Sequence, residues 1–184
     1  MKQTLILLFF IICTVSTSFA QVQWNVSANV LLEAEEVAYF DPPDRFSGLG
    51  SAFLLRGAAL FPWGNRFIGG PYLKFSPGVE IFRFDESPTL VELGLSIGPR
   101  FEIVEEIEVR ALVDIGYRGF LSSSDIVSAD ALATNLNLEV IFFKENTISP
   151  KFNLGFLAQP AGGNEDVFFS FSPYWFIGGG IVVN

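Results

Sequence analysis

Apolar and polar residues alternate along most of the chain after residue 20. The alternation is longest over residues 89–103, where apolar side chains from Val91 to Ile103 occupy every second position. A period of two is typical of a β-strand whose two faces meet different surroundings. The same pattern predicts eight strands, at residues 22–33, 47–62, 66–84, 89–104, 107–120, 132–143, 147–158 and 167–183.

The connections between these strands differ in length in a regular way. Gly64-Asn65 is a two-residue hairpin signal, because such turns need positive φ. Together with short turns at 104–106 and 144–146, it makes the second, fourth and sixth connections tight. The other connections are 34–46, 85–88, 121–131 and 159–166, of which only 85–88 is short. An even strand count with short turns on one side predicts an all-β, eight-stranded antiparallel barrel with up-and-down meander topology.

Alternation does not by itself say which face of the barrel is apolar. A soluble lipocalin-like barrel has apolar side chains inside, and a membrane barrel has them outside. Several predicted strands exceed the roughly 5–6 residues typical of soluble proteins, and a membrane span needs about 9–11 tilted residues. The polar face is also rich in Gly, Ser and Asn, unlike a solvated surface. These features favour a transmembrane β-barrel.

If the apolar face is outside, the charged residues on the polar face lie in the lumen. A buried charge without a partner is costly, so a lumen with nearly equal numbers of acids and bases is expected to be paired. The predicted basic members are Arg56, Lys74, Arg100, Arg110, Arg118 and Lys151. The predicted acidic members are Glu33, Glu80, Glu92, Glu102, Glu108, Asp114 and Glu139.

Aromatic residues lie near the predicted strand ends. Trp24 and Trp63 are close to the tight turns, and Tyr117 is close to the longer loops. Trp and Tyr prefer the two interfaces of a membrane. The three residues are therefore predicted to be interfacial, whereas Trp175 is expected to lie mid-strand.

Composition excludes several classes of protein. The 184 residues are 50% hydrophobic and carry a net charge of −9, which argues against disorder and against nucleic-acid binding. A single cysteine excludes a disulfide scaffold and a thiolate zinc site. The absence of histidine removes the usual general base and metal ligand. We therefore expect no cofactor and no metal site.

The first twenty residues have the pattern of a secretory signal peptide. Lys2 precedes the apolar run LILLFFIIC, and Ser18-Phe19-Ala20 provides a small-x-small cleavage site. The run is too short for a transmembrane helix, which needs about 20 residues. We expect cleavage after Ala20 and a barrel domain over residues 21–184.

Candidate catalytic groups are weak. A serine nucleophile needs a positioned base, and Ser122–Ser124 have only Asp125 beside them. The carboxylate pairs Glu35-Glu36 and Glu105-Glu106 fall in predicted loops or turns, where solvated acids are common. The sequence therefore predicts a protein that is not an enzyme.

The connections on the long-loop side are strongly acidic, with only Arg45 as a base. Such loops could gather divalent cations beside lipopolysaccharide phosphates or face a basic protein partner, and they also keep the loops soluble. The acids are Glu35, Glu36, Asp41, Asp44, Asp85, Glu86, Asp125, Asp130, Glu165 and Asp166.

The signal peptide, the eight alternating strands, the tight turns and the charged lumen together resemble the small outer-membrane β-barrels of the OmpA/OmpX type. The Phe- and Gly-rich sequence from Gln21 is similar to the outer membrane protein beta-barrel domain group of Bacteroidota. The resemblance implies the outer membrane of a Gram-negative bacterium. Its partners would be outer-membrane lipid, lipopolysaccharide and the barrel-assembly machinery. Such barrels often end on an aromatic residue, whereas this chain ends on Asn184.

These observations predict a small barrel with a side-chain-filled lumen and a structural or surface-interaction role. Two alternatives stay open at this point. One is a soluble periplasmic ligand-binding barrel, and the other is a narrow pore of low conductance, because eight strands leave an interior just wide enough for side chains.

Overall fold

The computed structural model describes most of the predicted barrel domain. The described residues are 22–31, 36–39, 45–47, 53–77, 89–121, 128–158, 162–163, 167–169 and 174–184. The predicted signal peptide at 1–20 lies outside them. Within these ranges there is no helix that is both long and apolar enough to cross a membrane.

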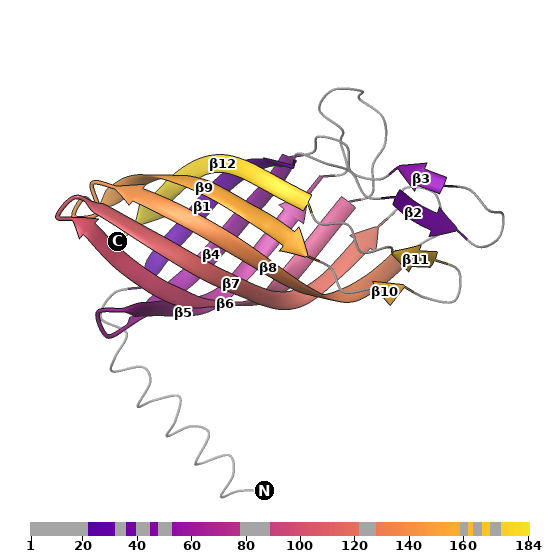
Figure 1. Cartoon of the computed structure of the whole chain (residues 1–184), viewed down its shortest axis with the longest axis horizontal. Coiled ribbons are helices and arrows are strands. Elements are labelled where there is room, and N and C mark those ends of the chain that lie inside the picture. Colours follow the sequence, from indigo (N-terminus) through magenta and orange to yellow (C-terminus); the bar gives the residue numbers. More distant parts are fainter. Residues whose placement is uncertain are drawn as a thin grey trace, which may run out of the picture.

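Eight antiparallel strands close into a barrel (Figure 1). Each strand pairs with the next barrel strand along the chain, and β12 pairs with β1 to close the ring. The prediction of an eight-stranded antiparallel β-barrel with up-and-down meander topology is therefore confirmed. The barrel strands are β1 (Gln23–Leu31), β4 (Phe53–Trp63), β5 (Phe67–Ser76), β6 (Thr89–Val104), β7 (Ile107–Leu121), β8 (Ser128–Phe142), β9 (Ile148–Ala158) and β12 (Tyr174–Val183).

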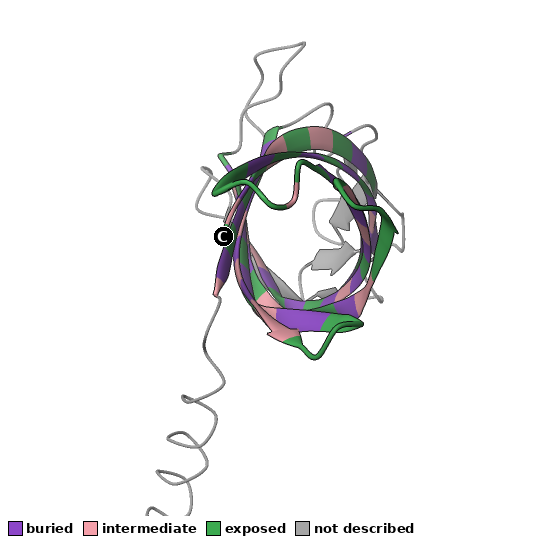
Figure 2. Cartoon of the chain, turned by 90° about the vertical axis from the view of Figure 1, so that its left-hand side faces the viewer, coloured by how far each residue is buried: buried purple, intermediate pink, exposed green. Residues whose placement is uncertain are grey.

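The alternation in the sequence separates an inner from an outer face. In β1, Asn25, Ser27 and Asn29 are buried, while Trp24 and Val26 are exposed. Buried and exposed residues alternate around the whole wall in the end-on view of Figure 2. The polar face is thus the inner one, which is opposite to the arrangement of a soluble ligand-binding barrel.

Three turns lie at one end of the barrel, the β4–β5 turn at 64–66, the β6–β7 turn at 105–106 and the β8–β9 turn at 143–147. The β6–β7 turn is Glu105-Glu106, between the paired residues Val104 and Ile107. The β4–β5 turn is longer than the predicted Gly64-Asn65, because Trp63 pairs with Phe67 across three residues. Gly64 takes φ 65° there, as a hairpin glycine is expected to do. We call this end of the barrel the turn end.

A second, small sheet lies beyond the opposite end, which we call the loop end (Figure 1). Its strand order is β10-β11-β2-β3, so it joins the first long connection to the last one. Its strands are β2 (Glu36–Tyr39), β3 (Arg45–Ser47), β10 (Gly162–Gly163) and β11 (Val167–Phe169). The predicted strands 47–62 and 167–183 were therefore too long, since each one covers parts of both sheets.

Two other predicted boundaries were wrong. Strand β5 ends at Ser76 rather than at residue 84, and Pro77 has no N–H with which to extend the ladder. The residues between Pro77 and β6, which include the predicted third connection 85–88, lie outside the described residues. Strand β8 begins at Ser128 rather than at residue 132, which shortens the fifth connection.

Glycine allows close backbone approach where β12 meets β1. A Cβ built on Gly180 would lie 2.0 Å from the carbonyl oxygen of Val26, well inside van der Waals contact. A Cβ built on Gly57, on the outer face of β4, would have nothing within 4 Å. Of these two glycines, Gly180 is therefore the one that requires the absence of a side chain.

The two glycines provide a matched test of this packing. We expect Gly180→Ala to lower the free energy of unfolding by about 1–3 kcal/mol, because the strands must move apart. We expect Gly57→Ala to leave it unchanged or to raise it by about 0.5–1 kcal/mol, since Gly costs backbone entropy in a strand. Urea unfolding in detergent, followed by Trp fluorescence, measures both. Equal effects at the two positions would contradict the close approach.

Candidate functional site

The lumen is filled by a network of charged side chains. Nine ionisable residues point inward and are almost completely buried, as the sequence placed them. They are Arg56, Lys74, Glu92, Glu108, Arg110, Asp114, Arg118, Glu139 and Lys151. Buried charges are tolerated only when they are paired and hydrogen-bonded, so their partners decide what the lumen can do.

Asp114 on β7 joins two cations, one from β4 and one from β5. Its Oδ1 lies 3.2 Å from Arg56 Nη2, and its Oδ2 lies 3.0 Å from Lys74 Nζ. Arg56 also donates to the Ser96 hydroxyl over 3.0 Å. Strands β4, β5, β6 and β7 therefore meet at one carboxylate.

Glu92 on β6 is the acceptor for a second group of donors. Lys74 Nζ and Arg118 Nη2 lie 3.0 and 2.6 Å from its oxygens. The Tyr72 hydroxyl donates to Glu92 over 2.7 Å, and Asn135 Nδ2 donates over 2.6 Å. Lys74 Nζ also lies 4.7 Å from the centroid of the Tyr72 ring, within cation–π range.

Sequence reasoning missed Tyr72 and Asn135 as members of the network. Tyr72 is two positions before Lys74, and Asn135 is four positions before Glu139. An even spacing places these side chains on the same face of the strand as the network residues, so the alternation could have identified both as lumenal.

Glu139 on β8 forms the centre of a third group. It accepts hydrogen bonds from Arg56 over 3.3 Å, from Lys151 over 2.8 Å and from Asn25 Nδ2 over 2.8 Å. Lys151 also donates to Asn25 Oδ1. Since β4 and β8 are opposite each other in the eight-strand ring, the Arg56–Glu139 pair crosses the full width of the lumen.

Glu108 holds two arginines near the turn end. Its oxygens lie 2.5 Å from Arg110 Nε and 2.6 Å from Arg100 Nη2. Arg110 also donates to Gln23 Oε1 over 2.5 Å. Because β7 and β1 are opposite strands of the ring, this bond is a second bridge across the lumen.

Glu102 does not lie in the lumen, which corrects the sequence prediction. Its side chain is 58% exposed, and it pairs with Lys144 in the β8–β9 turn over 2.7 Å. The hydrogen bond to Glu102 raises the pKa of Lys144. Strand β6 has passed the rim of the barrel at this point, so alternation no longer distinguishes inside from outside. Glu33 and Glu80, which were also predicted to be lumenal, lie outside the described residues.

The predicted near-neutrality of the lumen can be followed only in part, because Glu33 and Glu80 lie outside the described residues. Among the described residues, six cationic and four anionic side chains line the lumen, counting Arg100, whose side chain is 15% exposed. The cations are Arg56, Lys74, Arg100, Arg110, Arg118 and Lys151, and the anions are Glu92, Glu108, Asp114 and Glu139.

Apolar side chains fill the lumen beside the charged network. At the loop end, Leu31, Leu54 and Phe176 are almost completely buried. Toward the turn end, Leu60, Ile68, Leu112, Ala58 and Tyr72 form a cluster. Apolar side chains thus lie on both the loop-end and the turn-end side of the charged side chains, which limits the contact of these charges with water.

The outer face carries large exposed apolar side chains, such as Leu93 and Leu95 at 62% and 64%. Trp24 and Trp63 are exposed near the turn end, and Tyr117 is exposed toward the loop end. Trp175 was expected mid-strand but is the second residue of β12, at the loop end. Its ring packs edge-on against Phe156 at 5.1 Å.

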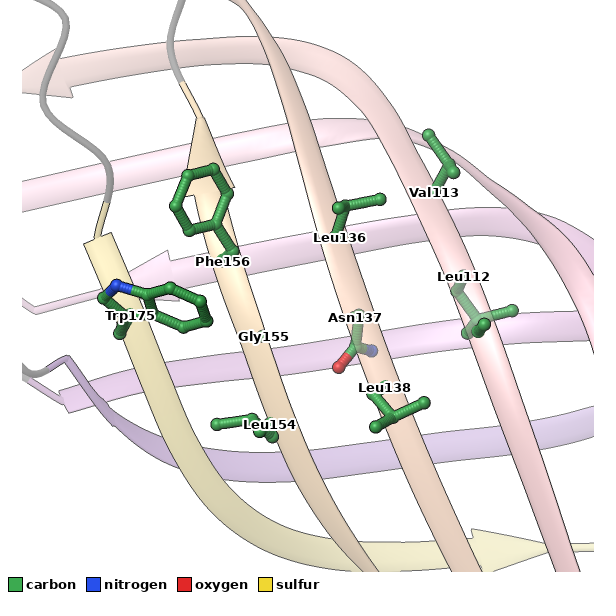
Figure 3. Close-up of a pocket in the computed structure, with 10 residues that line it drawn as sticks. Leu112, Val113, Leu136, Asn137, Leu138, Leu154, Gly155, Phe156 and Trp175 are labelled. Carbon is green, nitrogen blue, oxygen red and sulfur yellow. The ribbon is translucent and has the colours of Figure 1, made fainter.

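A groove lies on this outer face over β7, β8, β9 and β12 (Figure 3). Its volume is about 480 Å³, and Leu136, Leu138 and Leu154 form its floor beside the Phe156–Trp175 pair. The lining is almost wholly apolar. The groove belongs to the apolar belt and contains no polar group placed to orient a small molecule.

Most of the acidic residues predicted for the loop side lie outside the described residues. Glu36 lies in β2 and Asp130 in β8. Glu35, Asp41, Asp44, Asp85, Glu86, Asp125, Glu165 and Asp166 lie outside the described residues. Among the residues that the structure does describe, no three His, Cys, Asp or Glu side chains group into a metal site.

Comparison with known proteins identifies the fold. No family model matches the chain, and no curated protein matches its sequence. Neisserial surface protein A has a similar structure, with a TM-score of 0.60 at 8% identity, over 88% of this chain and 96% of that one. Ail, the attachment invasion locus protein of Yersinia pestis, aligns with a TM-score of 0.44 at 15% identity, over 88% of this chain and 99% of that one.

The central position of Glu139 leads to a test. We expect Glu139→Ala to lower the free energy of unfolding by about 3–5 kcal/mol, because buried cations lose their shared acceptor. Arg110→Ala should also destabilise the barrel, since Glu108 loses one of its two partners. Urea unfolding in detergent measures each loss.

The exposed Glu102 is the matched control. We expect Glu102→Ala to leave the unfolding midpoint unchanged, because the Glu102 carboxylate is exposed to solvent. If Glu139→Ala and Glu102→Ala shifted the midpoint equally, the inward register of β8 would be wrong.

Proposed function

We propose that this protein is an integral outer-membrane barrel with a closed lumen and a structural or surface-interaction role. The observation that carries the proposal is the pair of bridges across the lumen, Arg56 to Glu139 and Arg110 to Gln23. A lumen crossed by ion pairs resists a continuous water path. The apolar belt on the outside supplies the surface that lipid covers.

The structural part of this role follows from the network. Its hydrogen bonds and ion pairs join β1, β4, β5, β6, β7, β8 and β9 through their side chains. Side-chain bridges between non-adjacent strands stabilise the barrel beyond its backbone ladder. The protein therefore serves as a rigid element that holds its loops in place.

The surface part rests on the small sheet at the loop end. It brings β2 and β3 from the first connection together with β10 and β11 from the last one. With the turn end in the periplasm, this sheet and the acidic loops face the outside of the cell. Neisserial surface protein A, whose fold is similar, is by its name a surface protein. The partners that fit are lipopolysaccharide with its divalent cations, or a basic protein, and the barrel-assembly machinery would insert the chain.

The proposal excludes both alternative functions, and fractionation with conductance tests it. We expect extraction only with detergent, faster gel migration before boiling than after it, and no stepwise conductance in planar bilayers. Extraction into buffer without detergent would contradict membrane insertion. Regular conductance steps from the wild-type chain would instead support a narrow pore.

Orientation is tested with two single cysteines, since the chain after Ala20 has none of its own. We expect Ser124→Cys, in the fifth connection, to react with a membrane-impermeant maleimide on intact cells. Glu105→Cys, in the β6–β7 turn, should react only after the outer membrane is permeabilised. The reverse labelling order would place the turn end outside.

A further inference from the structure

A polar cavity lies inside the turn end of the barrel. Its volume is about 190 Å³, and it is lined by the ends of β1, β6, β7, β8 and β12 together with the β8–β9 turn. Buried Arg110 and Glu108 line it from within, and the exposed residues Glu102 and Glu145 lie at its rim. Unlike the groove of Figure 3, this cavity is lined mainly by charged and amide side chains.

Two guanidinium groups in this cavity have donors without acceptors. Arg110 donates through Nε and Nη2, but its Nη1 has no hydrogen-bond partner, and Glu139 Oε2 lies 4.0 Å away. Arg100 donates through Nη2 to Glu108, but its Nε has no partner. Buried donors of this kind are rare, because each one loses its hydrogen bonds to water.

The charge around these donors is uneven. Glu108 is the one carboxylate that both Arg100 and Arg110 contact closely, and the second carboxylate near Arg110, that of Glu139, is 4.0 Å away and is shared with Arg56 and Lys151. Lys144 adds a third cation, which Glu102 and Glu145 hold at the rim over 2.7 and 3.7 Å. The inner part of the cavity is therefore cationic, and the solvated acids lie outside it.

The other lining groups fix the arginines in place. Gln23 accepts from Arg110 and donates through Nε2 to Asn184 Oδ1 over 2.8 Å. Asn184 Nδ2 donates in turn to the carbonyl oxygens of Lys144 and Asn146 over 3.0 and 2.7 Å. The side chain of Gln23 is thus used at both of its polar atoms and cannot satisfy the remaining arginine donors as well.

We infer that this cavity binds a small oxyanion, a carboxylate or a phosphate group, between Arg100 and Arg110 at the turn end. The unpartnered Arg100 Nε and Arg110 Nη1 would donate to its oxygens, and Lys144 would lie at the entrance. Guanidinium groups match the planar, multi-acceptor geometry of such anions. A cation is disfavoured, because the buried atoms without a partner in the residues that line this cavity are nitrogen donors.

Side-chain NMR of the full chain in detergent micelles tests the site directly. With arginine labelled with nitrogen-15, sodium phosphate and sodium acetate are each titrated against sodium chloride at constant ionic strength. We expect the Nε–H resonances of Arg100 and Arg110 to shift saturably with at least one of the two anions. The anion that saturates at lower concentration identifies the preferred chemistry. No saturable shift with either would mean that the cavity holds only water, and would overturn the inference.

Two variants change the affinity in opposite directions. Arg100→Gln removes one donor at a partly exposed position, and we expect it to weaken binding about tenfold or more, as the loss of a charge-assisted hydrogen bond does. Glu108→Gln removes the carboxylate that competes with the anion, so we expect tighter binding. A purely structural role for Glu108 would not produce this gain.

Arg66→Gln is the matched control, because Arg66 is an exposed arginine in the β4–β5 turn at the same end and does not line the cavity. We expect its anion affinity to equal that of the wild type. An equal loss in Arg66→Gln and Arg100→Gln would show that only the general surface charge matters. Unchanged affinity in both Arg100→Gln and Glu108→Gln would also overturn the inference.

Discussion

The need to pair charges inside a closed barrel determines most of this structure. Arg56 on β4 and Glu139 on β8 come from opposite walls, so their contact requires the ring to be complete and in register. A shift of one residue in either strand would turn one charge outward into the apolar belt and remove one partner from the other. The network therefore specifies the register at the same time as it fills the lumen.

The same constraint explains how the apolar content is used. In a soluble domain, half of the residues being hydrophobic would imply a large internal core. Here Leu93, Leu95 and their neighbours on the outer face remain exposed, and the buried apolar residues form small groups near the two ends of the charged layer. In the membrane setting that we propose, the hydrophobic effect drives the outer wall out of water and into lipid, while ion pairs and hydrogen bonds act within the lumen.

Much of the fold could be predicted from the sequence, because a period of two indicates both that a segment is a strand and which residues lie on each of its two faces. It placed Arg56, Lys74, Glu92 and Glu139 inward without any knowledge of their partners. The period does not indicate at which residue a strand leaves the barrel. Glu102 continues the alternation of β6 past the rim, and residues 167–169 continue that of β12 in a different sheet. The contacts across the lumen could not be predicted either, since Arg56 and Glu139 are far apart in sequence.

The excess of cations in the described lumen is tolerated because arginine and lysine can share neutral acceptors. Ser96 accepts from Arg56, Asn135 from Arg118 and Asn25 from Lys151, so not every cation needs its own carboxylate. Near the turn end there are fewer acceptors than arginine donors. Gln23 accepts from one donor of Arg110, and Glu108 accepts from both Arg110 and Arg100. The unpaired arginine donors therefore lie at the end of the lumen that holds the polar cavity. A bound oxyanion would supply there the acceptor that the chain itself provides elsewhere in the lumen.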